Sequence, residues 1–127
     1  MYRCALAALL ACGLHAHADA QVARKFTQYA LRGAIVFADY PQIMLNGQPA
    51  RLAPGARVRD QDNRIVTPGS LAGASAIVNY TVDLGGNQVR DVWILRPKEA
   101  AVSPWPTTPE QARNWIFNVG EQTWSTP

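Results

Sequence analysis

The side chains best suited to metal chemistry lie near the amino terminus, in the stretch ACGLHAHADA at residues 11–20. The potential ligands of zinc or copper in it are Cys12, His15, His17 and Asp19. Cys4 is the only other cysteine among the 127 residues, and no other histidine occurs. A metal site needs its ligands held in a fixed geometry, so this site would exist only if the segment belongs to the folded protein.

The same residues have the features of a secretory signal peptide. A positive charge near the start is followed by an apolar run at residues 5–14, and an A-x-A pattern ends at Ala20. The apolar run is too short to span a bilayer. We therefore expect a signal peptide at residues 1–20, cleaved after Ala20 or after Ala18, and a protein located in the periplasm or secreted. An alternative is a lipoprotein signal, in which the LLAC motif leads to acylation of Cys12.

Removal of the leader would restrict the chemistry of the mature protein. Without residues 1–20, the 127-residue chain keeps 107 residues, with no cysteine and no histidine. Disulfides, thiol nucleophiles, Ser-His-Asp triads, histidine acid–base catalysis and zinc sites built on these residues are then excluded. Carboxylate, lysine and tyrosine chemistry remain. We expect no cofactor and no resident metal, and a protein that is not an enzyme.

The rest of the chain has the pattern of short β-strands separated by Gly, Pro and Asn. The first predicted strand covers residues 31–38, with Ile35 and Phe37 on one face. Asn46-Gly47 predicts a two-residue hairpin turn with positive φ at both positions. Its second arm is expected to end at a turn, APG, before another strand at ARVR; further strands are predicted at residues 64–66, ASAIVNYTVD and QVRDVWIL. These signals predict a mainly β fold, a small antiparallel barrel or sandwich of about six short strands with one C-terminal helix.

The last predicted hairpin can be given a register. With Gly85-Gly86 at its tip, Val82 faces Val89, Tyr80 faces Asp91 and Val78 faces Trp93. Trp93 is then expected in the core. Asp91 falls on the same face, either hydrogen-bonded near a barrel rim or as a desolvated carboxylate at a ligand site.

The chain changes character after the predicted strands. Thr108 and Pro109 are typical of a helix start, with Gln111 closing a capping box, and an apolar stripe follows at helical spacing up to a stop at Gly120. We expect this helix to pack on the barrel or on a partner, and the tail beyond it to be frayed. The predicted organisation is a signal peptide (residues 1–20), a lead-in (21–30), a β-barrel domain (31–97) and a Pro/Trp-rich tail with a short helix (98–127).

The segments LRGAIVF, IMLNGQPARLAPGARVRD, SLAGASAIVNYTVD and VRDVWIL together resemble small secreted proteins of Gram-negative bacteria whose function is uncharacterised. The same pattern is loosely similar to periplasmic small-barrel domains of the OB or SH3 kind. This resemblance covers about half of the chain and implies a β fold in the periplasm. No motif in it is tied to chemistry, so it carries over no functional residues.

Two groups of residues are candidates for a ligand or partner surface. They are the basic cluster Arg51, Arg57, Arg59 and Arg64, and the tryptophans Trp105 and Trp124. The cluster suits an anionic partner, although it also fits a solvated strand face with local ion pairs. The tryptophans would either dock the tail onto the barrel or stack on a glycan or peptide. The DQDN turn at residues 60–63, with Asp83, is a weak candidate for calcium because the EF-hand spacing is missing.

The sequence thus favours a non-enzymatic binding or accessory module of the periplasm. Alternatives are a structural or docking component of an envelope or secretion assembly and, third, a carboxylate-based hydrolase. The partner is left open between an anionic envelope component and another envelope protein. No nucleic acid is expected, and no transmembrane segment after cleavage.

Overall fold

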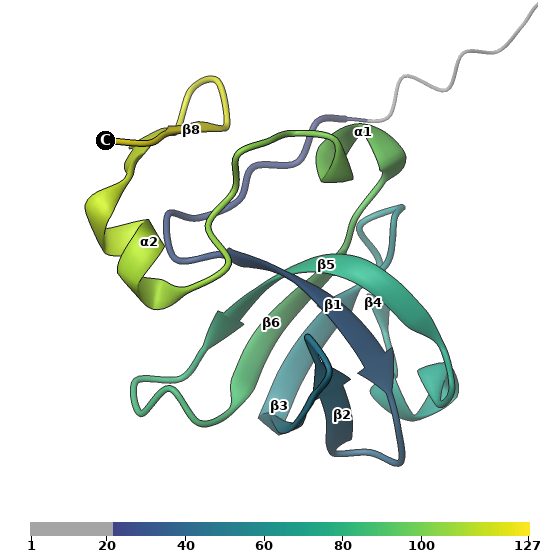
Figure 1. Cartoon of the computed structure of the whole chain (residues 1–127). Coiled ribbons are helices and arrows are strands. Elements are labelled where there is room, and N and C mark those ends of the chain that lie inside the picture. Colours follow the sequence, from purple (N-terminus) through teal and green to yellow (C-terminus); the bar gives the residue numbers. More distant parts are fainter. Residues whose placement is uncertain (1–21) are drawn as a thin grey trace, which may run out of the picture.

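Five strands close into a small barrel, drawn in the lower part of Figure 1. They are β1 (Leu31–Phe37), β2 (Gln42–Leu45), β3 (Gln48–Arg59), β5 (Ser75–Val82) and β6 (Val89–Ile94). Around the barrel the order is β1-β2-β3-β6-β5, and β5 pairs with β1 again. The predicted small β-barrel is confirmed, with one parallel pair, β3 and β6, among antiparallel neighbours.

The computed structural model describes residues 22–127. The predicted signal peptide, its cleavage sites and the candidate metal ligands near the amino terminus lie outside the described residues. The elements outside the closed barrel are β4 (Ile65–Val66), a 3-10 turn (Pro68–Leu71), α1 (Pro97–Ala100), α2 (Pro109–Asn114), β7 (Ile116–Asn118) and β8 (Thr123–Ser125). Residues 22–30 and 95–127 together form a second layer on one side of the barrel, which we call the cap (Figure 1).

The barrel core follows from the period-2 alternation of apolar residues along its strands. β1 shows this plainly, because Leu31, Gly33, Ile35 and Phe37 are buried, whereas Arg32 is partly exposed and Ala34 and Val36 are exposed. The fully or nearly fully buried members of the core are Leu31, Ile35, Phe37, Ile43, Leu52, Val58, Val78, Tyr80, Val89 and Val92. Every barrel strand therefore contributes to one apolar interior.

The Asn46-Gly47 turn has the conformation that the sequence predicts. Asn46 and Gly47 have φ values of 52° and 77°, which the two-residue hairpin requires. The Asn46 side chain also accepts a hydrogen bond from the Ala34 N–H at 2.9 Å, which ties the turn to β1.

The turn predicted at APG is wrong, because β3 runs through it as one strand of 12 residues. The pairing of β3 with β6 shifts between Leu52 and Arg57, and Gly55 lies in this irregular stretch with a φ of 76°. Such a bulge bends a strand without ending it. It lets the first half of β3 pair with β2 and the second half pair with β4 and β6.

The register predicted for the last hairpin is wrong by one residue beyond its first pair. Val82 faces Val89 as expected, but an irregularity follows, so that Thr81 faces Asp91 and Asn79 faces Trp93. Val92 is therefore completely buried, while Trp93 turns to the outer face of the barrel and packs against the cap. The physical reason is a bulge at Arg90, which adds one residue to β6 and inverts the alternation after it.

The C-terminal helix starts where the sequence predicts but ends early. The Thr108 side chain accepts a hydrogen bond from the Gln111 N–H at 3.2 Å, which caps α2. The Gln111 side chain accepts from Thr107 instead of closing the predicted capping box on Thr108. After Asn114 the chain forms the β7–β8 hairpin, so the predicted stripe up to Gly120 and the frayed tail are both wrong. The cross-strand pair of Phe117 and Trp124, 4.7 Å apart and stacked, favours the hairpin over further helix.

A second apolar cluster holds the cap together and joins it to the barrel. Its buried members come from both ends of the described chain and are Phe26, Ala30, Leu95, Trp105 and Trp124. Trp93 meets Phe26 edge-on, with ring centroids 5.7 Å apart. The cap is thus a layer with its own core, and Trp93 is its contact on the barrel side.

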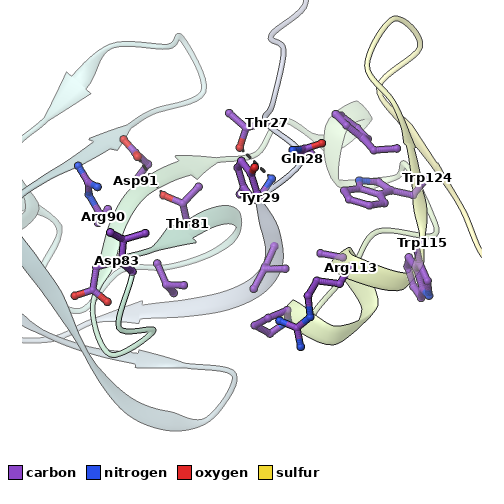
Figure 2. A pocket seen from close by; sticks show the side chains of 16 residues that line it. Thr27, Gln28, Tyr29, Thr81, Asp83, Arg90, Asp91, Arg113, Trp115 and Trp124 are labelled. Carbon is purple, nitrogen blue, oxygen red and sulfur yellow. Dashed lines mark hydrogen bonds between the residues drawn. The ribbon is translucent and has the colours of Figure 1, made fainter.

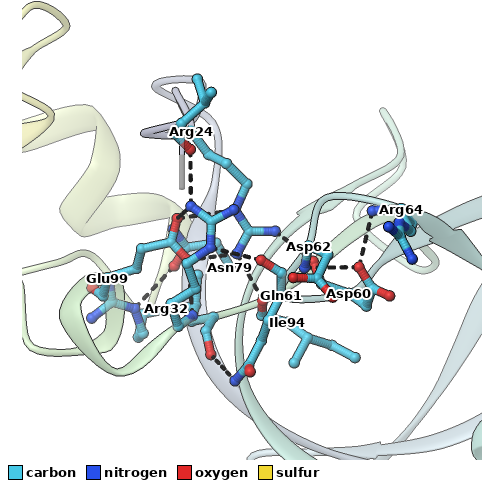
Figure 3. Close-up of polar contacts among 12 residues, drawn as sticks. Arg24, Arg32, Asp60, Gln61, Asp62, Arg64, Asn79, Ile94 and Glu99 are labelled. Atoms are coloured by element: carbon cyan, nitrogen blue, oxygen red, sulfur yellow. Dashed lines mark hydrogen bonds and ion pairs between the residues drawn. The ribbon is translucent and has the colours of Figure 1, made fainter. Parts of the chain in front are cut away.

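Buried arginines make the polar attachment of the cap, as Figure 3 shows. The Arg24 side chain is only 4% exposed and donates to the Glu99 carboxylate and to the backbone carbonyls of Asp60 and Ile94. Glu99 also accepts a hydrogen bond from the backbone N–H of Arg96 at 2.8 Å. The Glu99 carboxylate therefore joins the N-terminal segment to α1, and Arg24 links this pair to the end of β6.

Arg32 makes a second attachment from β1. Its guanidinium donates to the Asn79 side chain at 2.9 Å and to three carbonyls of the segment around α1, at Glu99, Ala100 and Val102. It also lies over the ring of Trp105, 5.1 Å from the centroid. Burial lowers the pKa of this guanidinium, and the nearby Glu99 charge acts in the opposite direction.

Candidate functional site

The predicted basic cluster is spread along β3 and the turn that follows. Arg51 and Arg57 are exposed at positions on either side of the β3 bulge, and Arg64 is exposed just before β4. Arg59 is partly buried, since its guanidinium lies 3.7 Å from the Asp91 carboxylate and 5.7 Å from the ring centroid of Trp93. Of the four arginines, Arg59 alone lines either of the two pockets described below.

The two candidate tryptophans lie inside the cap. Trp105 is 6% exposed, and its Nε1 donates to the Ala30 carbonyl at 2.9 Å. Trp124 is 5% exposed, and its Nε1 has no hydrogen-bond partner among the described residues. Both tryptophans are therefore buried in the apolar cluster of the cap, and Trp124 also lines a groove.

The acidic turn at residues 60–63 is held by its own side chain. The Asp60 carboxylate accepts hydrogen bonds from the N–H groups of Asp62 and Arg64, both at 2.9 Å (Figure 3). These bonds order the connection from β3 to β4. Over residues 22–127, no group of three or more Asp, Glu, His or Cys side chains is placed to hold a metal ion.

An open groove of about 970 Å³ lies between the barrel and the cap. Figure 2 shows its two walls: Thr81, Asp83, Arg90 and Asp91 on β5, β6 and their loop, facing Arg113, Trp115 and Trp124 of the cap. Tyr29 lies between the walls, next to Thr27, whose hydroxyl accepts a hydrogen bond from the Tyr29 N–H at 3.2 Å. We call this site the cap groove.

Large apolar side chains are open to solvent in the cap groove. Tyr29 is 70% exposed, and Leu84, at the tip of the β5–β6 loop, is fully exposed. Leu31, Val82, Pro109, Ala112, Trp115 and Phe117 complete the apolar lining. A concave surface of this size and composition, with a few polar groups, is typical of ligand sites.

The charged side chains of the groove fall into two groups. Asp91 already accepts a hydrogen bond from the Thr81 hydroxyl at 3.1 Å and faces Arg59. Asp83 accepts from the loop N–H groups of Asn87 and Gln88. Arg90 on β6 and Arg113 on α2, in contrast, have no ion pair and no side-chain hydrogen bond within the described residues. The two arginines without a partner therefore lie on opposite walls of the groove, while the Asp83 carboxylate is hydrogen-bonded to amides but has no ion pair among the described residues.

A smaller pocket of about 650 Å³ has Trp93 in its lining. Its cations are Arg24, Lys25, Arg59 and Arg96. Three of them are engaged inside the fold, since Arg24 and Arg96 share Glu99 and Arg59 faces Asp91. This pocket consequently offers less free charge and less apolar surface than the cap groove.

Comparisons with protein-family models, with curated proteins and with solved structures gave no match for this chain. Among the described residues, none of the helices has the length and apolar character needed to cross a membrane.

The sequence did not single out the residues that define the cap groove. Tyr29, Leu84, Arg90 and Arg113 come from four separate segments, and each is an ordinary surface residue within its own segment. Of the residues that the sequence marked, Trp124, Asp91 and Asp83 line this groove. The sequence did contain one indication of this site. Leu84 lies beside Gly85-Gly86 at a predicted hairpin tip, where a leucine side chain cannot reach the core.

Proposed function

We propose that this chain is an exported, non-enzymatic binding module of the periplasm and that its ligand occupies the cap groove. The observation that carries the proposal is the exposure of Tyr29 and Leu84 in a groove whose arginines, Arg90 and Arg113, have no partner within the described residues. Tyr and Arg are among the residues that contribute most to binding energy at protein interfaces.

Two further features support a binding role over catalysis. Residues 22–127 contain no cysteine and no histidine. The two carboxylates of the groove, Asp83 and Asp91, are each engaged by neighbouring donors of the fold. The expectation of export rests on the leader pattern at residues 1–20.

Site-specific photo-crosslinking in intact cells tests the proposal. A benzophenone amino acid is placed at Leu84, in the groove, and in a matched variant at Ile65, which is 67% exposed on β4 and outside the groove. We expect a discrete adduct from position 84 and none from position 65, with both proteins in the periplasmic fraction. Equal labelling from both positions, or no adduct from position 84, would contradict the groove as the binding site.

A second candidate function is a docking component of an envelope assembly, with the β7–β8 hairpin as the contact. Ile116 and Val119 are 73% and 64% exposed on this hairpin, whereas Ala112 and Trp115 pack within the cap. A crosslinker at Val119 that captures a partner, with none captured at Leu84, would favour this alternative.

A further inference from the structure

We infer that the occupant of the cap groove is an acidic peptide segment with apolar residues between its carboxylates. The inference rests on the proposed function, because it names the ligand of the same groove. Three properties of the lining carry it: free charge, apolar content and a shortage of uncharged hydrogen-bonding groups.

The free charge selects an anionic ligand. Arg90 lies on the barrel wall and Arg113 on the cap wall, so a ligand in the groove meets a guanidinium on each side (Figure 2). Asp91 already faces Arg59 and accepts from Thr81, so Asp83 is the one carboxylate of the lining without an ion pair among the described residues, against two such arginines. A guanidinium binds a carboxylate through two parallel hydrogen bonds, which favours acidic groups at both walls.

The lining between the two arginines is aliphatic and aromatic. Leu31, Val82 and Leu84 come from the barrel side, and Pro109 and Ala112 come from α2. Such side chains match leucine-like or aromatic side chains of a ligand, whose burial is favourable in proportion to apolar area. Tyr29, exposed between the walls, supplies a broad aromatic face for the same contact.

The shortage of uncharged polar side chains argues against an acidic glycan. The uncharged hydrogen-bonding side chains of the lining are Thr27, Gln28, Tyr29 and Thr81, with the indole N–H of Trp115; the N–H of Trp124 is buried, and both threonine hydroxyls already bond within the protein. A sugar polymer brings many hydroxyl groups, and each one that loses water without gaining a partner costs free energy. An acidic peptide needs fewer such partners because its side chains between the carboxylates can be apolar.

Selection from a random dodecapeptide phage library on the purified protein tests the inference. We expect enriched sequences with acidic residues flanking aliphatic or aromatic ones. A synthetic consensus peptide should bind the double variant Arg90→Glu/Arg113→Glu at least about tenfold more weakly, because attraction at both walls becomes repulsion. Selection on that variant should enrich basic sequences instead.

The matched control is the double variant Arg51→Glu/Arg64→Glu, which changes net charge equally at exposed arginines outside the groove. Its affinity for the consensus peptide should stay within about twofold of the unmodified protein. Equal weakening in the two double variants would show a general charge effect and would overturn the inference. Thermal unfolding of all variants verifies that the fold is kept.

An acidic sugar probe separates failure of the inference from failure of the proposed function. Oligogalacturonate that binds the groove and is lost on Arg90→Glu/Arg113→Glu, with no acidic peptide selected, would refute the peptide and leave the binding module intact. Enriched peptides without acidic residues would have the same meaning. Absence of any binding, together with no adduct from Leu84, would refute both.

Discussion

Glu99 offers the sharpest test of how the two segments of the cap are joined and how Arg24 is held against the barrel. Its carboxylate is the acidic partner of both Arg24 and Arg96, and the Arg24 and Glu99 side chains are only 4% and 14% exposed. The substitution Glu99→Gln keeps the size of the side chain and one acceptor oxygen but removes the charge. Arg24 then remains as a buried guanidinium that has no counter-charge, with the retained amide oxygen and the carbonyls of Asp60 and Ile94 as its acceptors.

The expected loss of stability is large for a domain of this size. Breaking a buried ion pair by removing one partner costs about 3–5 kcal/mol. The retained acceptor and the slight exposure of Glu99 place the expected value near the lower end, at about 3 kcal/mol, out of the roughly 5–15 kcal/mol that stabilise a typical domain. At about 4–8 °C per kcal/mol for a small domain, the melting temperature should fall by at least about 12 °C.

Urea unfolding followed by tryptophan fluorescence, together with calorimetry, measures this loss. The control is Glu121→Gln, because Glu121 is exposed and has no ion pair among the described residues. The control should change stability by no more than about 0.5 kcal/mol. Equal stability of the two variants would show that the carbonyl partners alone satisfy Arg24, and the reasoning from the buried charge would be refuted.

The Glu99 carboxylate should also affect how the free energy of unfolding depends on pH in the acid range. Burial raises the pKa of Glu99, but hydrogen bonds and charges of Arg24 and Arg96 outweigh it and hold the pKa below its ordinary value of 4.5. Because the pKa is lower in the folded state, the contribution of Glu99 is complete above pH 4.5 and is lost as the pH falls through the folded value. The Glu99→Gln variant should therefore lose stability less steeply with falling pH than the unmodified protein does.

Three further substitutions or deletions test the packing. A Cβ added at Gly33 would lie 2.9 Å from Cε1 of Tyr80, so Gly33→Ala should cost about 1–3 kcal/mol in urea unfolding, and an unchanged midpoint would contradict this contact. Deleting residues 103–127 removes the two buried tryptophans of the cap and should raise the binding of an apolar dye; no increase would show that the barrel covers its outer face without them. Val92→Ala should cost about 2 kcal/mol because Val92 is fully buried, and a stability loss within error would restore the register that places Trp93 in the core.

Local signals in the sequence predicted the parts of the fold that depend on neighbouring residues. The turn at Asn46-Gly47 needs positive φ, which few residue types adopt, so its two residues identify it. The alternation of buried residues in β1 and the capping of α2 by Thr108 likewise depend on residues only a few positions apart. These features required no knowledge of distant contacts.

The errors arise where barrel closure or tertiary packing decides. The predicted register of β5 and β6 was extended from the Val82–Val89 pair on the assumption that the pairing is regular. The bulge at Arg90 interrupts this pairing. The segment after Asn114 carries apolar residues that fit helical spacing, yet the contact of Phe117 with Trp124 selects a hairpin. Nothing in a single window of sequence distinguishes these outcomes.

The candidate site was harder to predict than the fold. Arg51, Arg57, Arg59 and Arg64 drew attention because they are close in sequence, but the free arginines of the groove are Arg90 and Arg113. Those two belong to elements on opposite walls, and only the docking of the cap brings them to one site. Arg24 and Glu99, 75 positions apart, were missed for the same reason.

The composition of the cap from both ends of the chain also determines the order in which the molecule can fold during its synthesis. All strands of the barrel are complete by Ile94, so the barrel can close as soon as that part of the chain is free. Phe26 cannot reach its final surroundings then, because its backbone N–H binds the side chain of Gln122, 96 positions later, and its ring packs on Trp105. A chain interrupted before its last few residues would thus have a finished barrel beside exposed aromatic side chains, the kind of surface that promotes aggregation and engages chaperones.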